Sequence, residues 1–277
     1  MAVRRLRLDA ELVRRGLARS REHGAELIAA GRVSVNGQRA AKPATAVTVD
    51  ADLVVREDPD RPDFVSRGGH KLAGALEVFA AHGLVVAGRR CLDAGASTGG
   101  FTDVLLRAGA AEVVAVDVGY GQLAWSLRSD ERVVVHDRTN IRDLTPELVG
   151  GPVDLVVGDL SFISLRLVLD ALISVVRPDG DLALMVKPQF EVGKERLGKG
   201  GVVREVEHRL DAVLDVAGEA SVRGWGPVAV ATSPLPGPAG NIEYFLWLRR
   251  GPARVSESQI ADEVRRSGSL GAPDERL

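Results

Sequence analysis

The stretch DAGASTGGF, residues 93–101, combines one acidic residue with glycines, alanines, two hydroxyls and a phenylalanine. It follows a short apolar run and precedes an expected helix, which places a bound ligand at the carboxyl edge of a sheet. A dinucleotide fingerprint needs glycine at its first, third and sixth positions, yet Ser97 occupies the third position counted from Gly95. No lysine-hydroxyl pair of a phosphate-binding loop follows either. The loop therefore fits a pyrophosphate poorly.

Three carboxylates near this loop favour a nucleoside ligand without phosphates. Asp93 is unfavourable beside a phosphate but favourable beside an amine or a sulfonium. Asp117 ends the next expected strand, where it can accept both ribose hydroxyls, and Asp137 follows the third strand, where it can meet an adenine amine. We therefore predict S-adenosyl-L-methionine as the cofactor; the alternative is a structural turn whose glycines only permit tight packing. The candidate cofactor-binding residues are Asp93, Gly95, Ala96, Ser97, Thr98, Gly99, Gly100, Phe101, Asp117, Val118, Asp137 and Asp159.

From about residue 69 onward, expected helices alternate with apolar runs that would position this loop. We expect helices at 70–81, from Thr98, and at 123–128, 165–176 and 205–219, and strands at RCLDAG, EVVAVDVG, RVVVHD, VDLVVGD, DLALMVK, GPVAVAT and NIEYFLWL. Several strands are apolar at consecutive positions, as in a sheet covered by helices on both faces. This predicts a doubly wound α/β domain. SESQIADEVRR predicts one more short helix, followed by a disordered end.

The N-terminal region differs in charge from the rest of the chain. Residues 1–42 hold ten Lys/Arg and four Asp/Glu, a net +6, which leaves −8 for the remainder of a chain whose total is −2. A basic N-terminal region followed by an acidic remainder favours a polyanionic partner such as nucleic acid for the N-terminal region, although a chance excess of arginine is the alternative. Helices expected near 10–17 and 20–30 and a hairpin turn at Asn36-Gly37 predict a small α+β domain.

Composition restricts the remaining possibilities. One cysteine, Cys91, excludes an internal disulfide framework and a clustered thiolate zinc site. No apolar run approaches the roughly 18 residues of a membrane span, and the Arg-rich start lacks the apolar stretch of a signal peptide. We expect a cytoplasmic, monomeric protein without stable membrane association. EDPDRPD, residues 57–63, contains two prolines and five charges of mixed sign and is typical of a linker.

Several longer stretches resemble the TlyA family of ribosomal RNA 2'-O-methyltransferases, sometimes named haemolysin A. They are DAGASTGGF, AVDVGYGQLAWSLR, GDLSFISL, VKPQFEVGK, GGVVR and SPLPGPAGNIEYFLWL, in this order. The segment from SREHGAELIAAGRVSVNG to VSRGGHKL is similar to the RNA-binding module first described in the fourth protein of the small ribosomal subunit. The resemblance implies a Rossmann-like class I methyltransferase fold, mostly parallel with an antiparallel last strand, similar to FtsJ/RrmJ. The implied domains are residues 1–60 for RNA binding, 61–65 as linker, 66–250 for methyl transfer and 251–277 as C-terminal extension.

The FtsJ resemblance implies a Lys-Asp-Lys-Glu tetrad at Lys71, Asp159, Lys187 and Glu243. Asp159 and Lys187 each end an apolar strand, and Glu243 meets the same edge if the last strand is antiparallel. A ribose 2'-hydroxyl must lose its proton during attack, and a lysine accepts a proton only when neutral. We expect Lys187 to be the base and Lys71 the neighbouring cation, with Asp159 and Glu243 as orienting carboxylates. No metal is required, because a sulfonium is already an activated methyl donor.

The partner implied by the resemblance is ribosomal RNA within the small and large subunits. The candidate RNA-binding residues are Arg4, Arg5, Arg14, Arg19, Ser20, Arg21 and Arg67. The C-terminal extension resembles the longer family form, which modifies cytidines in both subunits and affects sensitivity to capreomycin-type antibiotics. One departure is RPDF at Arg61–Phe64, where the family pattern is more aromatic.

Three other functions compete with this one. A base-amino methyltransferase often carries Asp/Asn-Pro-Pro-aromatic after the fourth strand, but residues 159–162 here are DLSF, without prolines. A membrane-active haemolysin would need a span or a strongly amphipathic basic helix. A ribosome-binding assembly factor that merely retains the cofactor site would not need the tetrad.

Overall fold

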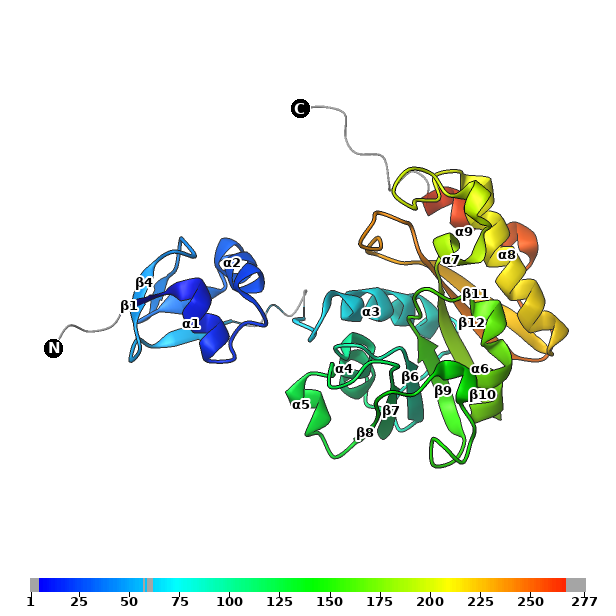
Figure 1. Ribbon diagram of the computed structural model, residues 1–277, viewed down its shortest axis with the longest axis horizontal. Coiled ribbons are helices and arrows are strands. Elements are labelled where there is room, and N and C mark those ends of the chain that lie inside the picture. Colours follow the sequence, from blue (N-terminus) through cyan, green and yellow to red (C-terminus); the bar gives the residue numbers. More distant parts are fainter. Residues whose placement is uncertain (1–4, 57, 59–61, 268–277) are drawn as a thin grey trace. The chain divides into compact units, whose positions relative to one another are not determined.

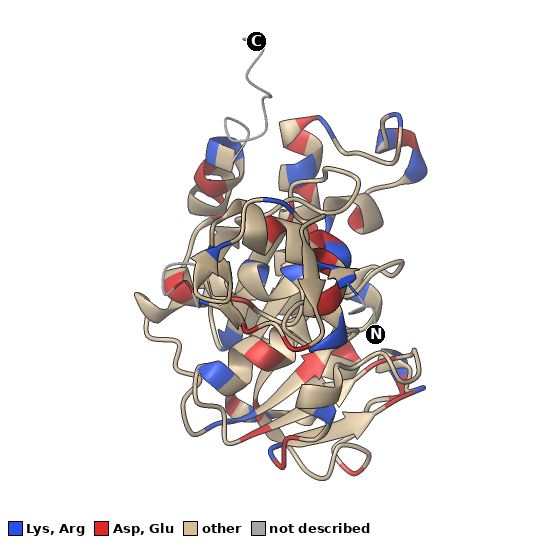
Figure 2. Ribbon diagram, turned by 90° about the vertical axis from the view of Figure 1, so that its left-hand side faces the viewer, with Lys and Arg blue, Asp and Glu red and all other residues tan. Residues whose placement is uncertain are grey.

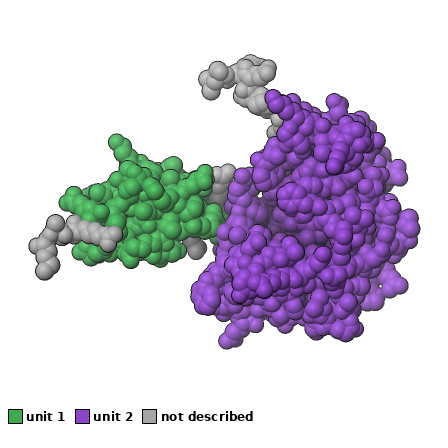
Figure 3. All heavy atoms as spheres, viewed as in Figure 1, with its two compact units in different colours: residues 1–63 green, residues 64–277 purple. Residues whose placement is uncertain are grey.

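The computed structural model describes residues 5–56, 58 and 62–267. The chain divides into two compact units, residues 1–63 and 64–277 (Figure 3). Asp63 ends the first unit and Phe64 begins the second, so the boundary falls within the linker expected at 61–65, of which Arg61 lies outside the described residues. The expected disorder at the C-terminus concerns residues 268–277, which also lie outside the described part.

The first unit is a small α+β domain. Its elements are β1 (Arg5–Arg7), α1 (Leu8–Arg14), α2 (Arg21–Ala29), β2 (Val33–Val35), β3 (Gln38–Arg39), β4 (Ala46–Thr48) and β5 (Leu53–Val55) (Figure 1). Strands pair in the order β3-β2-β5, and β1 pairs with β4. The hairpin turn is confirmed, because Asn36 and Gly37 have φ of 49° and 78° between β2 and β3. The Ser20 side chain caps α2 by accepting a hydrogen bond from the His23 N–H at 3.1 Å.

The second unit is built on one seven-stranded sheet. Its strands are β6 (Arg90–Ala94), β7 (Glu112–Val116), β8 (Val133–His136), β9 (Val153–Gly158), β10 (Val176–Val186), β11 (Trp225–Thr232) and β12 (Tyr244–Arg250). Their order is β11-β12-β10-β9-β6-β7-β8. The last strand, β12, runs antiparallel to β10 and β11, while β6 to β10 pair in parallel. The predicted mostly parallel sheet with an antiparallel last strand is confirmed.

Helices cover both faces of this sheet (Figure 1). They are α3 (Arg67–Ala80), α4 (Gly100–Arg107), α5 (Trp125–Arg128), α6 (Leu169–Val175), α7 (Pro188–Glu191), α8 (Val206–Val222) and α9 (Glu257–Ser267), with short 3₁₀ turns at Ile141–Asp143, Leu165–Leu167 and Lys194–Arg196. β12 shows why the strands are apolar throughout. Tyr244 and Leu246 enter the core that holds residues of α6, α8 and α9, whereas Phe245 and Trp247 enter the core that holds residues of α3 and α4.

Some element boundaries differ from those predicted. The helix expected from Thr98 begins at Gly100, because Ser97 and Gly99 have φ of 47° and 96° and form a turn first. The helix expected at 165–176 is a 3₁₀ turn followed by α6, since Val168 leaves the helical region. The last strand begins at Tyr244 rather than Asn241, whose side chain instead bonds to the backbone of Val203 and Gly201. Across the residues that the structure describes, no helix is both long and apolar enough to cross a membrane.

Candidate active site

The glycine loop between β6 and α4 is held tightly from two sides. Gly95 has φ of 85°, and a Cβ placed there would lie 2.9 Å from the carbonyl oxygen of Asp159, so no side chain fits. On the other side, the Asp117 carboxylate accepts hydrogen bonds from the backbone N–H of Ser97 at 2.7 Å and of Gly119 at 2.6 Å. The loop is thereby fixed between the ends of β9 and β7, at the carboxyl edge of the sheet.

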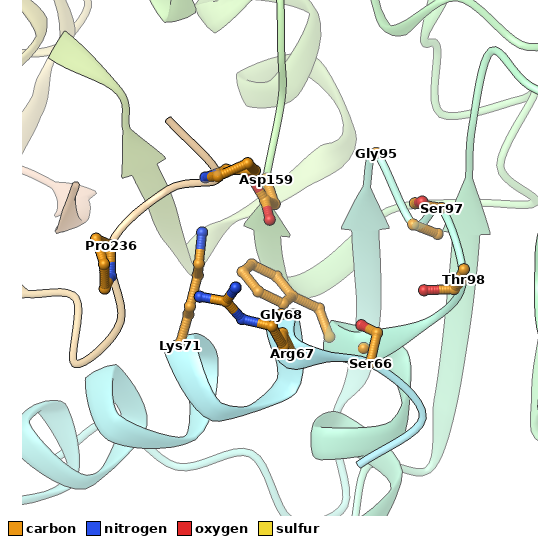
Figure 4. Close-up of a pocket in the computed structure, with 13 residues that line it drawn as sticks. Ser66, Arg67, Gly68, Lys71, Gly95, Ser97, Thr98, Asp159 and Pro236 are labelled. Atoms are coloured by element: carbon orange, nitrogen blue, oxygen red, sulfur yellow. The ribbon is translucent and has the colours of Figure 1, made fainter. Parts of the chain in front are cut away.

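A cavity of about 200 Å³ opens over this loop. Its lining residues come from the start of α3, from the glycine loop, from the end of β9 and from the loop between β11 and β12: Ser66, Arg67, Gly68, Lys71, Gly95, Ala96, Ser97, Thr98, Gly100, Phe101, Asp159, Pro236 and Pro238. Figure 4 shows Lys71 of α3 and Asp159, which follows β9, pointing into the same space. The cavity therefore joins the candidate cofactor loop to two members of the predicted tetrad.

The four tetrad residues form two ion pairs. Lys71 Nζ lies 2.5 Å from Glu243 Oε2, and Lys187 Nζ lies 2.5 Å from Asp159 Oδ1 and 2.8 Å from Ser161 Oγ. The side chains of both lysines and of Glu243 are less than a tenth exposed. The sheet produces this arrangement: Asp159 and Lys187 directly follow β9 and β10, and Glu243 directly precedes the antiparallel β12. The four residues therefore meet at one edge of the sheet, with each lysine matched to one carboxylate, and their catalytic roles stay predictions.

Asp93 is a fully buried acid directly before the glycine loop. Its Oδ2 accepts a hydrogen bond from the Thr102 hydroxyl at 2.7 Å, and its Oδ1 has no hydrogen-bond partner among the described residues. Desolvation raises the pKa of Asp93 to about 7, and the negative charges of Asp159 and Asp117 add to that shift. A nearby positive charge would reverse this shift.

Five predicted cofactor-binding residues do not line the cavity: Asp93, Gly99, Asp117, Val118 and Asp137. Asp117 fixes the loop as described, and the Val118 side chain next to it is exposed. Asp137 Oδ2 accepts a hydrogen bond from Arg128 at 3.0 Å. Contacts of these residues with ribose and adenine remain predictions.

The predicted RNA-binding residues divide between the two units. Arg4 lies outside the described residues. Arg5, Arg14, Arg19 and Arg21 are exposed on the first unit, whereas Arg67 belongs to the second unit and lines the cavity. Figure 2 marks the Lys and Arg positions in blue along the ribbon. Buried carboxylates hold two of these arginines, since Arg14 pairs with Glu11 and Arg21 with Asp9. The pKa of each of these two acids is lowered to about 2, mainly by the hydrogen bond from Arg14 to Glu11 and from Arg7 to Asp9. The Ser20 side chain is occupied as a helix cap.

The sequence analysis missed several residues at the site. Ser66, Gly68, Pro236 and Pro238 line the cavity, and the only signal for them is that they lie within the family motifs. Phe162 follows Ser161, which Lys187 contacts, and is 91% exposed, with φ of 64° and its ring 5.3 Å from that of Phe190. Its signal is the DLSF motif, where an aromatic residue stands at the position used by base-directed methyltransferases.

This chain is similar to several known proteins. Residues 64–250 match the model of the FtsJ-like methyltransferases, and residues 6–53 match the S4 domain. The 16S/23S rRNA (cytidine-2'-O)-methyltransferase TlyA of two Mycobacterium tuberculosis strains is 61% identical, covering 97% of this chain and 99% of the relative. YqxC of Bacillus subtilis, provisionally named an rRNA methyltransferase, is 44% identical over 95% of this chain and 92% of its own. A solved structure from Streptococcus thermophilus, provisionally named a hemolysin, superposes with a TM-score of 0.72 at 35% identity, covering 97% of both chains.

Proposed function

The chain belongs to the FtsJ-like methyltransferases, and within them to the TlyA family; from this we propose that it transfers a methyl group from S-adenosyl-L-methionine to the 2'-hydroxyl of cytidine in ribosomal RNA. The observation that supports this most strongly is the placement of the Lys71–Glu243 and Lys187–Asp159 pairs against a glycine loop. A loop alone fits any class I methyltransferase. Two largely buried lysine-carboxylate pairs beside it fit an enzyme that must remove a hydroxyl proton.

The residues around the cavity suit the cofactor. Gly95 and Gly68 leave backbone exposed to the cavity without side chains, and the buried Oδ1 of Asp93 has no partner among the described residues. A cofactor bearing an amine and a sulfonium supplies positive charge, which such a carboxylate favours. S-adenosyl-L-methionine brings an electrophilic methyl group, so no metal is required. Asp117 and Asp137 would accept the ribose and adenine hydrogen bonds.

Lys187 is the proposed base. Its Nζ is held by Asp159 and Ser161, which fix the direction in which a neutral amine would present its lone pair. The amine takes the proton of the 2'-hydroxyl while the ribose oxygen forms its bond to the methyl carbon. Lys71 and Glu243 form the second charged pair, which adds a fixed field and orients the ribose. Holding hydroxyl and methyl carbon in line supplies much of the remaining acceleration.

Phe162 is the proposed platform for the target base. An exposed phenylalanine beside the reacting centre offers a face on which an unstacked base can lie, as RNA-modifying enzymes commonly require. Its left-handed backbone conformation is unfavourable by roughly 1–3 kcal/mol for a bulky residue, so its surroundings must enforce it. This favours a functional reason for the placement.

We further propose that cytidines of both subunits are modified. The relative named for both 16S and 23S rRNA matches 97% of this chain. The first unit supplies affinity and orientation through its arginines, and the second performs the chemistry. The enzyme acts as a cytoplasmic monomer, and its modification affects sensitivity to capreomycin-type antibiotics.

The test is methylation of ribosomal subunits from a strain lacking the enzyme. Purified protein and isotopically labelled cofactor should label both subunits, and nuclease digestion should yield 2'-O-methylcytidine. Base-methylated cytidine would favour the amino-methyltransferase alternative. Binding to subunits without methyl transfer would favour an assembly factor, and release of haemoglobin from erythrocytes by protein unable to methylate would favour a haemolysin.

A further inference from the structure

Glu191 is a buried acid with no part in the reaction proposed above. It ends α7, four residues after Lys187, and its side chain is 1% exposed. Burial raises its pKa, and the hydrogen bond from Ser164 offsets only part of that shift. A carboxylate is unfavourable at such a position unless hydrogen bonds compensate. Its partners therefore indicate what it does.

Those partners all belong to the segment after β9. Glu191 Oε2 accepts a hydrogen bond from the Ser164 hydroxyl at 2.5 Å, and Oε1 accepts one from the backbone N–H of Leu165 at 2.8 Å. Arg166 adds a bond to the Glu191 carbonyl oxygen at 3.0 Å. One carboxylate thus fixes the C-terminal end of the loop that begins at Asp159.

The same loop is fixed at its other end and at its middle by residues of the same KPQFE motif. Lys187 binds Asp159 and Ser161, and the ring of Phe190 packs at 5.3 Å on that of Phe162. Between these attachments stands Phe162, with its left-handed backbone. A bulky residue keeps that conformation only if its neighbours impose it.

We propose that Glu191 is a positioning residue, which holds the Ser161–Ser164 turn so that Phe162 presents its ring to the target base. This inference rests on the proposed function, and it extends it to a residue that contacts neither cofactor nor reacting atoms. Glu191 acts through Phe162, so removing Phe162 should make Glu191 dispensable.

The experiment is a double-mutant cycle. Glu191→Ala should lower the single-turnover methylation rate of ribosomal subunits about 10- to 100-fold, because a displacement of about 1 Å suffices for such a loss. Cofactor affinity, measured by titration calorimetry, should stay unchanged. In the Phe162→Ala background, Glu191→Ala should have no further effect.

Conservative variants separate positioning from folding. Glu191→Gln keeps an acceptor for Leu165 and should stay within about threefold of the parent rate, since only charge assistance is lost. Ser164→Ala removes one partner, leaves the carboxylate in place, and should also lose its effect when Phe162 is absent. Glu195→Gln, an exposed acid four residues along the same segment, is the matched control and should match the parent.

Several outcomes would overturn the proposal. They are an unchanged rate for Glu191→Ala, equal losses with and without Phe162, or a loss in Glu191→Gln as large as in Glu191→Ala. If Glu191→Ala does not fold, Ser164→Ala and Glu191→Gln decide by the same comparison. Failure of the proposed function is distinguishable, because the parent protein would then not methylate subunits at all.

Discussion

Lys71 Nζ and Glu243 Oε2 lie 2.5 Å apart, although 172 positions separate the two residues in the chain. The pair joins the first helix of the second unit to the segment that enters its last strand. Both side chains are almost fully buried, and Glu243 Oε1 has no partner among the described residues. A charge left alone here would have neither solvent nor a counter-ion.

Lys71→Met should therefore lower the free energy of unfolding of the second unit by about 3–5 kcal/mol, because it leaves a buried unpaired carboxylate. Adding Glu243→Gln should restore most of that stability without restoring methylation. Urea denaturation followed by tryptophan fluorescence reports this unit alone, since all three tryptophans, Trp125, Trp225 and Trp247, lie in it. A double variant no more stable than Lys71→Met would contradict the pair as the cause.

Lys187→Ala should abolish methyl transfer while cofactor and RNA binding persist, because the proposed proton acceptor is lost and the binding surfaces are not. Lys187→Arg should be equally inactive, since a guanidinium keeps its proton in proteins. The parent rate should rise with pH as the neutral amine becomes available. Single-turnover methylation across pH measures both, and near-normal turnover by Lys187→Arg would leave this lysine a purely electrostatic role.

Asp117→Ala should weaken cofactor binding with the fold retained. The change removes the proposed acceptor for the ribose hydroxyls and also releases the Ser97 and Gly119 N–H groups, so the loop loses one of its two supports. Titration calorimetry with S-adenosyl-L-methionine measures the affinity. Asp130→Ala, which replaces a partly exposed acid whose side chain binds Arg132, serves as control. An unchanged affinity for Asp117→Ala would refute the assignment.

Replacing Arg19 and Arg21 together by alanine should weaken binding to ribosomal subunits and make it less dependent on salt. Each lost phosphate contact should lower the slope of log affinity against log salt by roughly 0.7–0.9. Arg223→Ala is the control, because Arg223 follows α8 in the second unit and pairs with Asp170 and Glu219. If the slope does not change, the two arginines are ordinary solvated surface.

Asp93 predicts a pH dependence of stability. Its pKa is raised by burial from 3.8 to about 7 in the fold. A raised pKa stabilises the fold fully below the unfolded-state pKa, and this contribution is lost as pH rises through about 7. Relative to Asp93→Asn, the parent should therefore lose up to about 4 kcal/mol of unfolding free energy between pH 4 and 7. Denaturation series at several pH values measure this, and a constant difference between the two proteins would exclude titration of Asp93.

The sequence predicts much of this site, because a residue that directly follows an apolar strand of a parallel sheet lies at the carboxyl edge of that sheet. Asp159 and Lys187 follow apolar runs, so their common location is foreseeable. The ion-pair partner of each lysine is not foreseeable, because the sequence does not show whether Asp159 or Glu243 lies next to a given lysine. The packing of the loop between β11 and β12 against α3 cannot be predicted from the sequence either. A Cβ at Gly74 of α3 would lie 2.8 Å from Pro234, and a contact between segments that distant in sequence has no local pattern.

In the first unit, local turns can be predicted from the sequence but strand pairing cannot. Helix ends and the Asn36-Gly37 turn are predictable from single residues with left-handed backbone. The pairing of β1 with β4 is not, because strands of three residues are too short to show alternation. For Phe162 only part could be predicted. The DLSF motif draws attention to this position, but the contacts that hold its loop, and with them its exposed ring, are known only from the structure.

Gly95 limits how this enzyme could be redesigned for bulkier methyl-donor analogues. The carbonyl oxygen of Asp159 occupies the space where a Cβ would stand, so any side chain at position 95 pushes on the residue that holds Lys187. Gly95 therefore offers no side chain that could be shortened to enlarge the pocket, and a substitution of Gly95 would disturb the acceptor side. Pro236 and Pro238 line the cavity from the loop between β11 and β12 and belong to neither ion pair. Selection for altered donor specificity should accordingly find its productive substitutions in that proline-rich loop.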